Sequence, residues 1–153
     1  MLSFMNMDVV GFCSIETLHL QLNPTCTILI KAPNGKGKST ILSALVWAIY
    51  GKNLKGVSDV NTWKEVRPKD YKGTMVQVFF QKDTHTYKII RCQKYEEVLE
   101  DGAKGKDRLV FIKDGDIIDI KGKGKIQDAI NREIGLSYTL FMNSIMFGQG
   151  IKR

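Results

Sequence analysis

The chain has 153 residues, 43% of them hydrophobic and 25% charged, and this predicts one globular domain, residues 1–153, with its own hydrophobic core. No apolar run approaches the roughly 20 residues of a membrane helix, so no membrane partner is expected. The N-terminus lacks the basic and apolar segments of a secretory signal. The cysteines Cys13, Cys26 and Cys92 are far apart, which favours reduced thiols in a cytosolic compartment and argues against a metal site.

Positive charge is in excess, with 23 Lys and Arg against 16 Asp and Glu and a net charge of +7. The clusters are residues 64–72, 104–108 and 121–125. A field of this sign suits a polyanionic partner such as nucleic acid. Each cluster taken singly is explained as well by a solvated loop, so the net charge alone does not establish DNA binding.

The first thirty residues are predicted to form strands. Residues 17–22 alternate polar and apolar side chains, which is typical of a half-buried strand. Residues 27–30 form an apolar run typical of a strand buried on both faces. Residues 39–50 have apolar side chains at helical spacing, and Gly51 stands where a left-handed helix cap is expected.

The rest of the chain is predicted as a meander followed by helices, after a long surface loop over residues 52–71. The predicted strands are 74–81, 87–92, 109–112 and 117–120. The last two flank Asp114-Gly115, a strong hairpin-turn signal, whereas residues 96–106 are predicted to be a charged connection. Residues 126–134 form a predicted helix that ends at Gly135, and Ser137 is expected to cap a second short helix.

Residues 32–40 match the phosphate-loop pattern of Gly, four residues, then Gly-Lys-Ser/Thr, with Ala32 at the first position. Gly35 and Gly37 allow the backbone N–H groups to point at phosphates. The following helix adds the positive end of its dipole. Because a buried strand, this loop and an amphipathic helix come in the required order, the sequence predicts binding of ATP with Mg²⁺.

Each loop residue has a role in that chemistry. Lys38 is expected to reach the β- and γ-phosphates, Ser39 to bind Mg²⁺ through its hydroxyl, and Thr40 to bond the α-phosphate. The predicted nucleotide-binding residues of the loop are Asn34, Gly35, Lys36, Gly37, Lys38, Ser39 and Thr40. The alternative is a Gly/Lys-rich turn that precedes a helix by chance, which the flanking strand and helix disfavour.

Other chemistry-bearing residues are interpreted as structural. Residues 109–114 resemble an apolar strand that ends in a Mg²⁺-binding acid (Walker B), but Lys113 interrupts the run and Asp114 belongs to a hairpin turn. His19 and His85 are interpreted as surface residues without a carboxylate partner. Trp47 is expected to pack inside the protein.

Several separated features point to one family. They are residues 11–14, the Asn-Gly-Lys-Gly-Lys-Ser-Thr loop at 34–40, a helix that ends at residues 48–51, and the late segment 138–150 with Gln149. Together they resemble the N-terminal ATPase lobe of SbcC-type proteins, the SMC-like ATPases of DNA double-strand-break repair, whose relatives bacteriophages encode as recombination endonuclease subunits. The expected fold is an α/β P-loop NTPase of ABC-ATPase type, N-terminal lobe only, with a mixed sheet around the loop-bearing strand and an antiparallel β-meander.

The resemblance implies further site residues. Gln149 matches the Q-loop glutamine, a catalytic and metal-binding residue that helps coordinate Mg²⁺ and the attacking water. A neutral amide suits this place because it adds no negative charge beside the phosphate. Lys64, Glu65 and Val66 lie where relatives bring a second loop near the nucleotide. Relatives often have arginine where this chain has Cys13, so one expected cationic contact is lost.

The resemblance also implies partners. In this family a long coiled coil leads to a C-terminal lobe with the Walker B acids and the signature motif, and neither is present here. The chain is therefore expected to be a truncated product, a split-gene product or half of an assembly, with ATP hydrolysis only when that lobe completes it. ATP would drive head dimerisation and gate access of double-stranded DNA to an SbcD-type nuclease subunit, in the cytoplasm (the host cytoplasm if phage-encoded).

Two alternatives stay open. One is another P-loop DNA ATPase, RecF-like or chromosome-organising SMC. The other is a non-hydrolysing nucleotide- or DNA-binding module that kept its phosphate loop. A transporter ATPase is disfavoured, because those proteins carry the glutamine loop much closer to the phosphate loop. Fold similarity alone does not choose among these, since function resides in the site.

Overall fold

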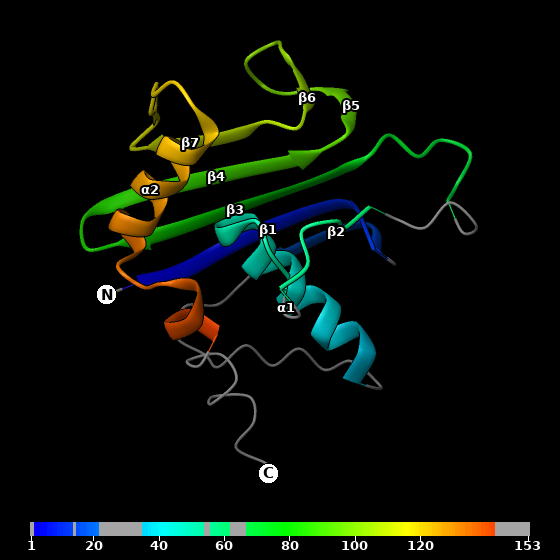
Figure 1. Ribbon diagram of the computed structural model, residues 1–153, viewed down its shortest axis with the longest axis horizontal. Coiled ribbons are helices and arrows are strands. Elements are labelled where there is room, and N and C mark those ends of the chain that lie inside the picture. Colours follow the sequence, from blue (N-terminus) through cyan, green and yellow to red (C-terminus); the bar gives the residue numbers. More distant parts are fainter. Residues whose placement is uncertain (1, 14, 22–34, 54–55, 62–66, 143–153) are drawn as a thin grey trace.

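A computed structural model describes residues 2–13, 15–21, 35–53, 56–61 and 67–142, with backbone alone at residues 2 and 35–39. A six-stranded sheet, in the order β2-β1-β3-β4-β7-β8, carries both labelled helices on one face (Figure 1). The elements are β1 (Leu2–Phe12), β2 (Ile15–Gln21), α1 (Gly35–Tyr50), β3 (Thr74–Lys82), β4 (His85–Gln93), β5 (Tyr95–Val98), β6 (Lys104–Lys106), β7 (Leu109–Lys113), β8 (Asp116–Ile117) and α2 (Lys123–Ile134).

The main core lies between the sheet and the helices. Alternate residues of β3 are fully buried on this face, with Val78 opposite Ile89 of β4 in the ladder. Trp47 of α1 packs against Phe12 of β1 with ring centroids 5.7 Å apart, which confirms its predicted packing role. Burying side chains of this size contributes about 1.5–3 kcal/mol each, so α1 is held mainly by its apolar face.

The predicted hairpins are confirmed. The β3–β4 ladder runs from Thr74↔Gln93 to Lys82↔His85, which leaves a two-residue turn. In the β7–β8 turn Asp114 and Gly115 have φ angles of 52° and 86°, the left-handed pair of a type I′ turn. The Asp114 carboxylate accepts a hydrogen bond from the Thr86 N–H at 3.0 Å. Asp114 therefore acts as a turn residue, as predicted, rather than as a Walker B acid.

Two expectations from the sequence are wrong in detail. Residues 96–106 are not a simple connection, because β5 and β6 pair as a separate two-stranded ribbon that Tyr95 anchors from a buried position. The strand predicted at 117–120 ends early, since β8 stops at Ile117 and the Ile118 N–H bonds to the Phe111 carbonyl at 2.8 Å. The ribbon was not predicted because residues 96–106 are rich in charged residues and glycine and lack the apolar alternation typical of strands.

The helix ends follow the predicted caps. Gly51 and Gly135 both have left-handed backbones, with φ of 80° and 78°, and close α1 and α2 through hydrogen bonds to Trp47 and Asn131. Ser137 accepts a hydrogen bond from the Leu140 N–H at 3.1 Å, and residues 138–142 are helical. Among the described residues, no helix has the length and apolar character needed to cross a membrane.

The α/β class and the antiparallel meander are thus confirmed. Every strand pair in the described residues is antiparallel. The loop-bearing strand predicted at 27–30, around which a mixed sheet was expected, lies outside the described residues.

Candidate nucleotide site

Helix α1 begins at Gly35, inside the phosphate-loop pattern, rather than at Ser39 as predicted. Its first turn contains two glycines and two lysines and no acidic residue. The N-terminal end of a helix carries a partial positive charge and unpaired N–H groups. With no carboxylate of its own in this turn, α1 presents a start that favours a bound anion.

The predicted site residues divide into two groups. The backbone of residues 35–40 lies in α1, and Thr40 is half-buried. The other candidates, Asn34, Lys64, Glu65, Val66 and Gln149, lie outside the described residues, as do the side chains of Lys36, Lys38 and Ser39. The predicted Mg²⁺ ligands, Ser39 and Gln149, therefore remain predictions.

The C-terminal end of α1 is held by a buried arginine of β4. Arg91 is 8% exposed; its Nε donates to the Ala48 carbonyl at 3.0 Å and an Nη to the Ile49 carbonyl at 3.3 Å. Burial lowers the pKa of Arg91 to about 10, so the guanidinium stays charged at neutral pH. A cation at this end interacts favourably with the helix dipole, and it fixes the helix whose first residues match the phosphate-loop pattern.

Gln127 of α2 joins the same cluster. Its Oε1 accepts a hydrogen bond from Arg91, and its Nε2 donates to the Ile49 carbonyl at 2.8 Å. Sequence reasoning missed this cluster, since Arg91 stands in an ordinary strand pattern and its partners on α1 are main-chain carbonyls. The one hint in the sequence was that Arg91 stands two residues after Ile89, at a position where strand alternation predicts a buried side chain.

The end of β1 is tied to the segment just before the predicted second loop. The Cys13 N–H donates to the Val60 carbonyl at 2.9 Å, and Asn61 forms a bridge with Phe12. The Asn61 side-chain amide donates to the Thr74 hydroxyl at 2.8 Å, and this hydroxyl donates to the Gly11 carbonyl at 2.6 Å. The chain that enters residues 62–66 is therefore fixed beside Cys13.

Gln93 of β4 strengthens this junction. Its Oε1 accepts from the Val60 N–H at 2.9 Å, and its Nε2 donates to the Ser58 carbonyl at 2.7 Å. One amide thus ties two main-chain groups of a loop that has no regular structure. This connection also escaped sequence analysis, because residues 58 and 93 are far apart in the chain.

Cys13 is half-buried and has a left-handed backbone with φ of 51°. Burial, with the nearby charge of Asp59, raises the pKa of its thiol. The side chain is therefore neutral at physiological pH. It supplies no charge that would replace the arginine of the family pattern.

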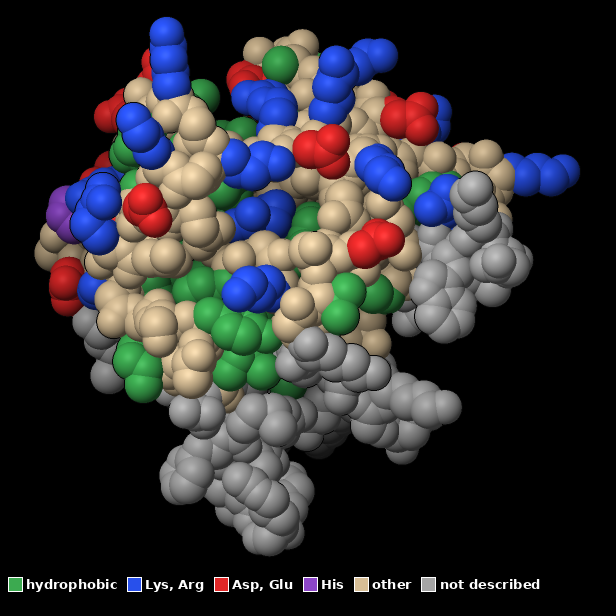
Figure 2. Space-filling view, viewed as in Figure 1, with side chains coloured by type: hydrophobic (Ala, Val, Ile, Leu, Met, Phe, Trp, Pro, Cys, Tyr) green, Lys and Arg blue, Asp and Glu red, His purple; other side chains and the backbone are tan. Residues whose placement is uncertain are grey.

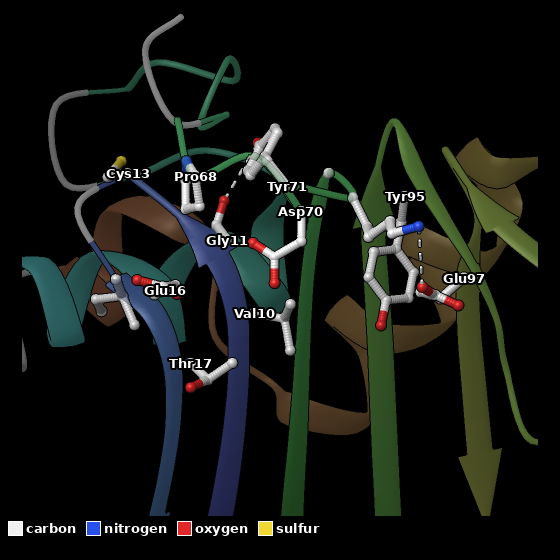
Figure 3. Close-up of a pocket in the computed structure, with 13 residues that line it drawn as sticks. Val10, Gly11, Cys13, Glu16, Thr17, Pro68, Asp70, Tyr71, Tyr95 and Glu97 are labelled. Carbon is white, nitrogen blue, oxygen red and sulfur yellow. Dashed lines mark hydrogen bonds and ion pairs between the residues drawn. The ribbon is translucent and has the colours of Figure 1, made fainter. Parts of the chain in front are cut away.

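A pocket of about 480 Å³ adjoins this junction (Figure 3). Val10 and Thr17 line it from paired strands, and Cys13, Tyr71 and Tyr95 close its other sides. Val10 packs in the smaller apolar cluster, away from the α1 core, so the pocket opens on the face of the sheet opposite α1. It is distinct from the start of α1.

Both histidines have a carboxylate partner, which corrects the sequence interpretation. His19 contacts Asp8 across the β1–β2 ladder, and His85 Nδ1 lies 2.6 Å from the Asp114 carboxylate. Strand pairing brings together residues 11 and 29 positions apart, which local sequence does not reveal. In the described part of the chain, no group of three His, Cys, Asp or Glu residues is placed to hold a metal ion.

Comparison with known proteins identifies relatives in DNA processing. The chain is 28% identical over 147 residues to exonuclease subunit 2 of Escherichia phage RB69, covering 95% of this chain and 23% of that protein. It is 24% identical over 127 residues to the DNA double-strand break repair Rad50 ATPase of Methanopyrus kandleri, covering 80% and 13%. The chain thus spans less than a quarter of the curated relatives it matches.

Solved structures support the fold. The recombination mediator RecF with ATP matches with a TM-score of 0.54 and 20% identity over 82% of this chain and 30% of RecF. A chain from work on ATP-driven dimerization and DNA-stimulated activation of SMC ATPases matches with a TM-score of 0.52 and 19% identity, over 88% and 81%. The fold of an N-terminal lobe of the ABC-ATPase type is therefore confirmed.

The resemblance to SbcC-type and Rad50-like ATPases, predicted from separated motifs, is confirmed by these relatives. The family described as AAA domain matches residues 7–153, which is nearly the whole chain. The protein belongs to the AAA domain family.

Proposed function

We propose that the chain is the ATP–Mg²⁺-binding part of an SMC-like DNA repair or recombination ATPase. One observation carries this proposal: the phosphate-loop pattern coincides with the N-terminus of α1, whose first turn holds lysines and glycines and no acid. Lys38 would neutralise the β- and γ-phosphates, while the hydroxyl of Ser39 would bind Mg²⁺. The fixed C-terminal end of α1 supports a rigid position for this loop.

Around that loop, two other segments would complete the site. Gln149 would bind Mg²⁺ and orient the attacking water, and residues 64–66 would contact the nucleotide from a second side. The anchoring of Asn61 beside Cys13 supports the second assignment, because it fixes the entry to residues 62–66. A neutral Cys13 would leave the nucleotide with one cationic contact fewer than in relatives with arginine.

Hydrolysis and nuclease control would need further polypeptide. We infer a C-terminal lobe with a coiled coil that supplies the catalytic acid, and ATP-dependent pairing of two heads. The phage relatives are named as exonuclease subunits, which supports an SbcD-type nuclease subunit and double-stranded DNA as partners. Gating of the nuclease by ATP is the function we assign to the complete assembly.

A RecF-like role is the second candidate, because RecF with ATP is among the matching structures. The exonuclease and Rad50 relatives favour the nuclease-linked role. Measuring ATP hydrolysis by the chain with and without a C-terminal lobe separates these two ATPase candidates from a non-hydrolysing module. Such a module would bind ATP yet gain no turnover from the lobe.

Thermal unfolding with and without Mg²⁺-ATP tests the nucleotide site. At one hundred times its Kd, a ligand that binds only the folded state adds about 2.7 kcal/mol. Lys38→Ala should abolish this stabilisation, and Ser39→Ala should remove its dependence on Mg²⁺. Lys125→Ala is the matched control, because Lys125 ends the same Gly-Lys-Gly-Lys tetrapeptide at the start of α2. Equal shifts in the Lys38 and Lys125 variants would contradict the assignment.

A further inference from the structure

Two tyrosine hydroxyls tie the chain that leaves α2 to the C-terminal end of α1. Tyr50, the last residue of α1, donates from its hydroxyl to the Leu136 carbonyl at 2.6 Å. The Tyr138 hydroxyl donates to the carbonyl of Asn53, just after α1, also at 2.6 Å. These partners are 86 and 85 positions apart in the chain, so the two bonds hold one segment against another rather than shaping a local turn.

Aromatic rings pack around the two hydrogen bonds. The Tyr50 ring meets the rings of Tyr138 and Phe141 edge-on, at centroid distances of 5.8 Å and 5.5 Å. Phe141 also packs on Phe4 of β1 at 5.9 Å and is 4% exposed. Edge-to-face pairs at such distances are favourable beyond the area that they bury. We call Tyr50, Tyr138 and Phe141 the aromatic clamp.

The space-filling view shows the same junction from outside. In Figure 2, apolar side chains gather in the lower half of the face, between the positions that α1 and the chain after α2 have in Figure 1. Residues 136–142 are therefore docked on α1 by apolar packing as well as by the two hydroxyls.

The clamp holds the end of α1 opposite to the phosphate-loop pattern. Helix α1 has 16 residues, and at about 1.5 Å per residue its two ends are about 24 Å apart. From residue 142 to Gln149, which lies outside the described residues, the chain has seven steps, and a fully extended chain covers at most about 25 Å in that number. Because the two lengths are nearly equal, Gln149 reaches the start of α1 only along an almost straight path from the clamp.

We propose that the aromatic clamp positions Gln149 at the γ-phosphate of bound ATP. The inference rests on the proposed function, in which Gln149 binds Mg²⁺ and orients the attacking water. With almost no spare length between residue 142 and Gln149, a small shift of the clamp withdraws the amide from the phosphate. The three clamp residues are thus positioning residues, which act on the nucleotide only through Gln149.

A clamp that only packs the core would behave differently when weakened. It would lower the stability of the chain and change the binding of ATP and ADP alike. A positioning clamp leaves the binding of ADP unchanged, since ADP has no γ-phosphate, and weakens the binding of ATP. The ratio of the ATP affinity to the ADP affinity therefore separates the two roles.

Titration calorimetry of the full chain with Mg²⁺-ATP and with Mg²⁺-ADP measures this ratio. Tyr50→Phe combined with Tyr138→Phe keeps both rings and removes both hydroxyl bonds. This double variant should lower the ratio about tenfold, as Gln149→Ala should, because each loses one hydrogen bond to a charged group. The matched control, Tyr87→Phe, removes a hydroxyl that donates to Glu133 at 3.0 Å outside the clamp, and it should keep the wild-type ratio.

A third measurement tests whether the clamp acts through the glutamine. Adding the two tyrosine changes to Gln149→Ala should lower the ratio no further, because coupled residues are not additive. A further fall would overturn the inference, as would a wild-type ratio in the double variant, an equal loss of ATP and ADP binding, or a Gln149→Ala ratio equal to that of the wild type. Failure of the proposed function is distinct: the wild type would then bind neither nucleotide, or Lys38→Ala would bind both as the wild type does.

Discussion

The same tetrapeptide, Gly-Lys-Gly-Lys, stands at the start of both helices: residues 35–38 open α1, and in residues 122–125 Gly122 is the N-cap of α2. Only α1 continues with hydroxyl residues, Ser39 and Thr40, while α2 continues with Ile126 and Gln127. A hydroxyl at that point is needed to bind Mg²⁺ beside the phosphates. The tetrapeptide therefore provides a cationic helix start, and only the two hydroxyl residues that follow it in α1 complete the phosphate-loop pattern.

The other ends of the two helices differ as well. The last turn of α1 is anchored by Arg91, which bonds to main-chain carbonyls and uses no carboxylate. The last turn of α2 is anchored through Glu133, which binds Lys113 at 2.8 Å and accepts the Tyr87 hydroxyl at 3.0 Å. The first anchor is buried and the second is about one-third exposed, so α1 should be fixed more firmly and less sensitive to acid.

The largest expected effect is on the α1 anchor. Arg91→Met keeps the apolar stem and removes the donors to the Ala48 and Ile49 carbonyls, which should cost about 2–3 kcal/mol. The matched change is Arg132→Met in the last turn of α2, where the side chain is exposed, and it should stay within about 0.5 kcal/mol. Urea unfolding measures both free energies of unfolding.

A similar loss of stability in both variants would show that the two helix ends are held equally firmly. A loss confined to Arg91→Met would show that the C-terminal end of α1 is held more firmly than that of α2. The urea concentration at which half of the protein is unfolded should then fall. The slope of the unfolding free energy against urea concentration should stay the same, because the same surface is exposed on unfolding. The loss of stability in Gln127→Ala should fall between the two, since this change removes one donor to Ile49 and one acceptor of Arg91 but leaves the bonds from Arg91 to α1 in place.

The next effect concerns the capping glycines. Gly51 and Gly135 have nearly the same φ, 80° and 78°, so alanine at either should cost about 1 kcal/mol from backbone strain. A Cβ at Gly51 would also lie 3.0 Å from the Arg91 guanidinium, whereas at Gly135 it would lie 3.4 Å from the flexible Lys82 ammonium. We expect about 2 kcal/mol for Gly51→Ala and about 1 kcal/mol for Gly135→Ala, measured by thermal unfolding.

Because the backbone cost is common to both glycines, the difference reports the contact with Arg91. In an Arg91→Met background, Gly51→Ala should lose this excess, as coupled neighbours do in a double-mutant cycle. If Gly51→Ala still costs more stability than Gly135→Ala in the Arg91→Met background, the additional strain does not come from the contact with Arg91.

Elements with a local signal could be predicted from the sequence. Asp114-Gly115 favours left-handed turn angles by itself, and Gly135 ends its helix because glycine adopts such angles without strain. Ser137 caps a helix through one side-chain oxygen. Each of these depends on residues that are close in the chain, so tertiary structure has little opportunity to override them.

Elements that depend on distant contacts could not be predicted. The β5–β6 ribbon has no apolar alternation and forms around Tyr95, over which Gly105 lies so closely that a Cβ would meet the ring at 2.6 Å. The His85–Asp114 pair depends on the register of two hairpins. Arg91 has its partners on another element. In the candidate site, the phosphate-loop pattern could be predicted from residue spacing and from the elements expected on either side of it, whereas the junction of Asn61 with β1 could not.

The smallest expected effect is the dependence on pH that the anchor of α2 contributes. The hydrogen bond from Lys113, with that from Tyr87, lowers the pKa of Glu133 from its ordinary 4.5. The contribution of ionised Glu133 to the free energy of unfolding is therefore fully present above pH 4.5. It is lost as the pH falls through the lowered pKa that Glu133 has in the folded state. Glu133→Gln should remove at most about 1 kcal/mol at neutral pH and flatten the acid limb of stability, measured by urea unfolding from pH 6 to pH 3 at roughly half-unit steps. The control is Glu96→Gln, at an exposed glutamate, which should leave the loss of stability at acid pH unchanged. If Glu133→Gln loses stability at acid pH as the wild type does, the anchor of α2 does not depend on this carboxylate.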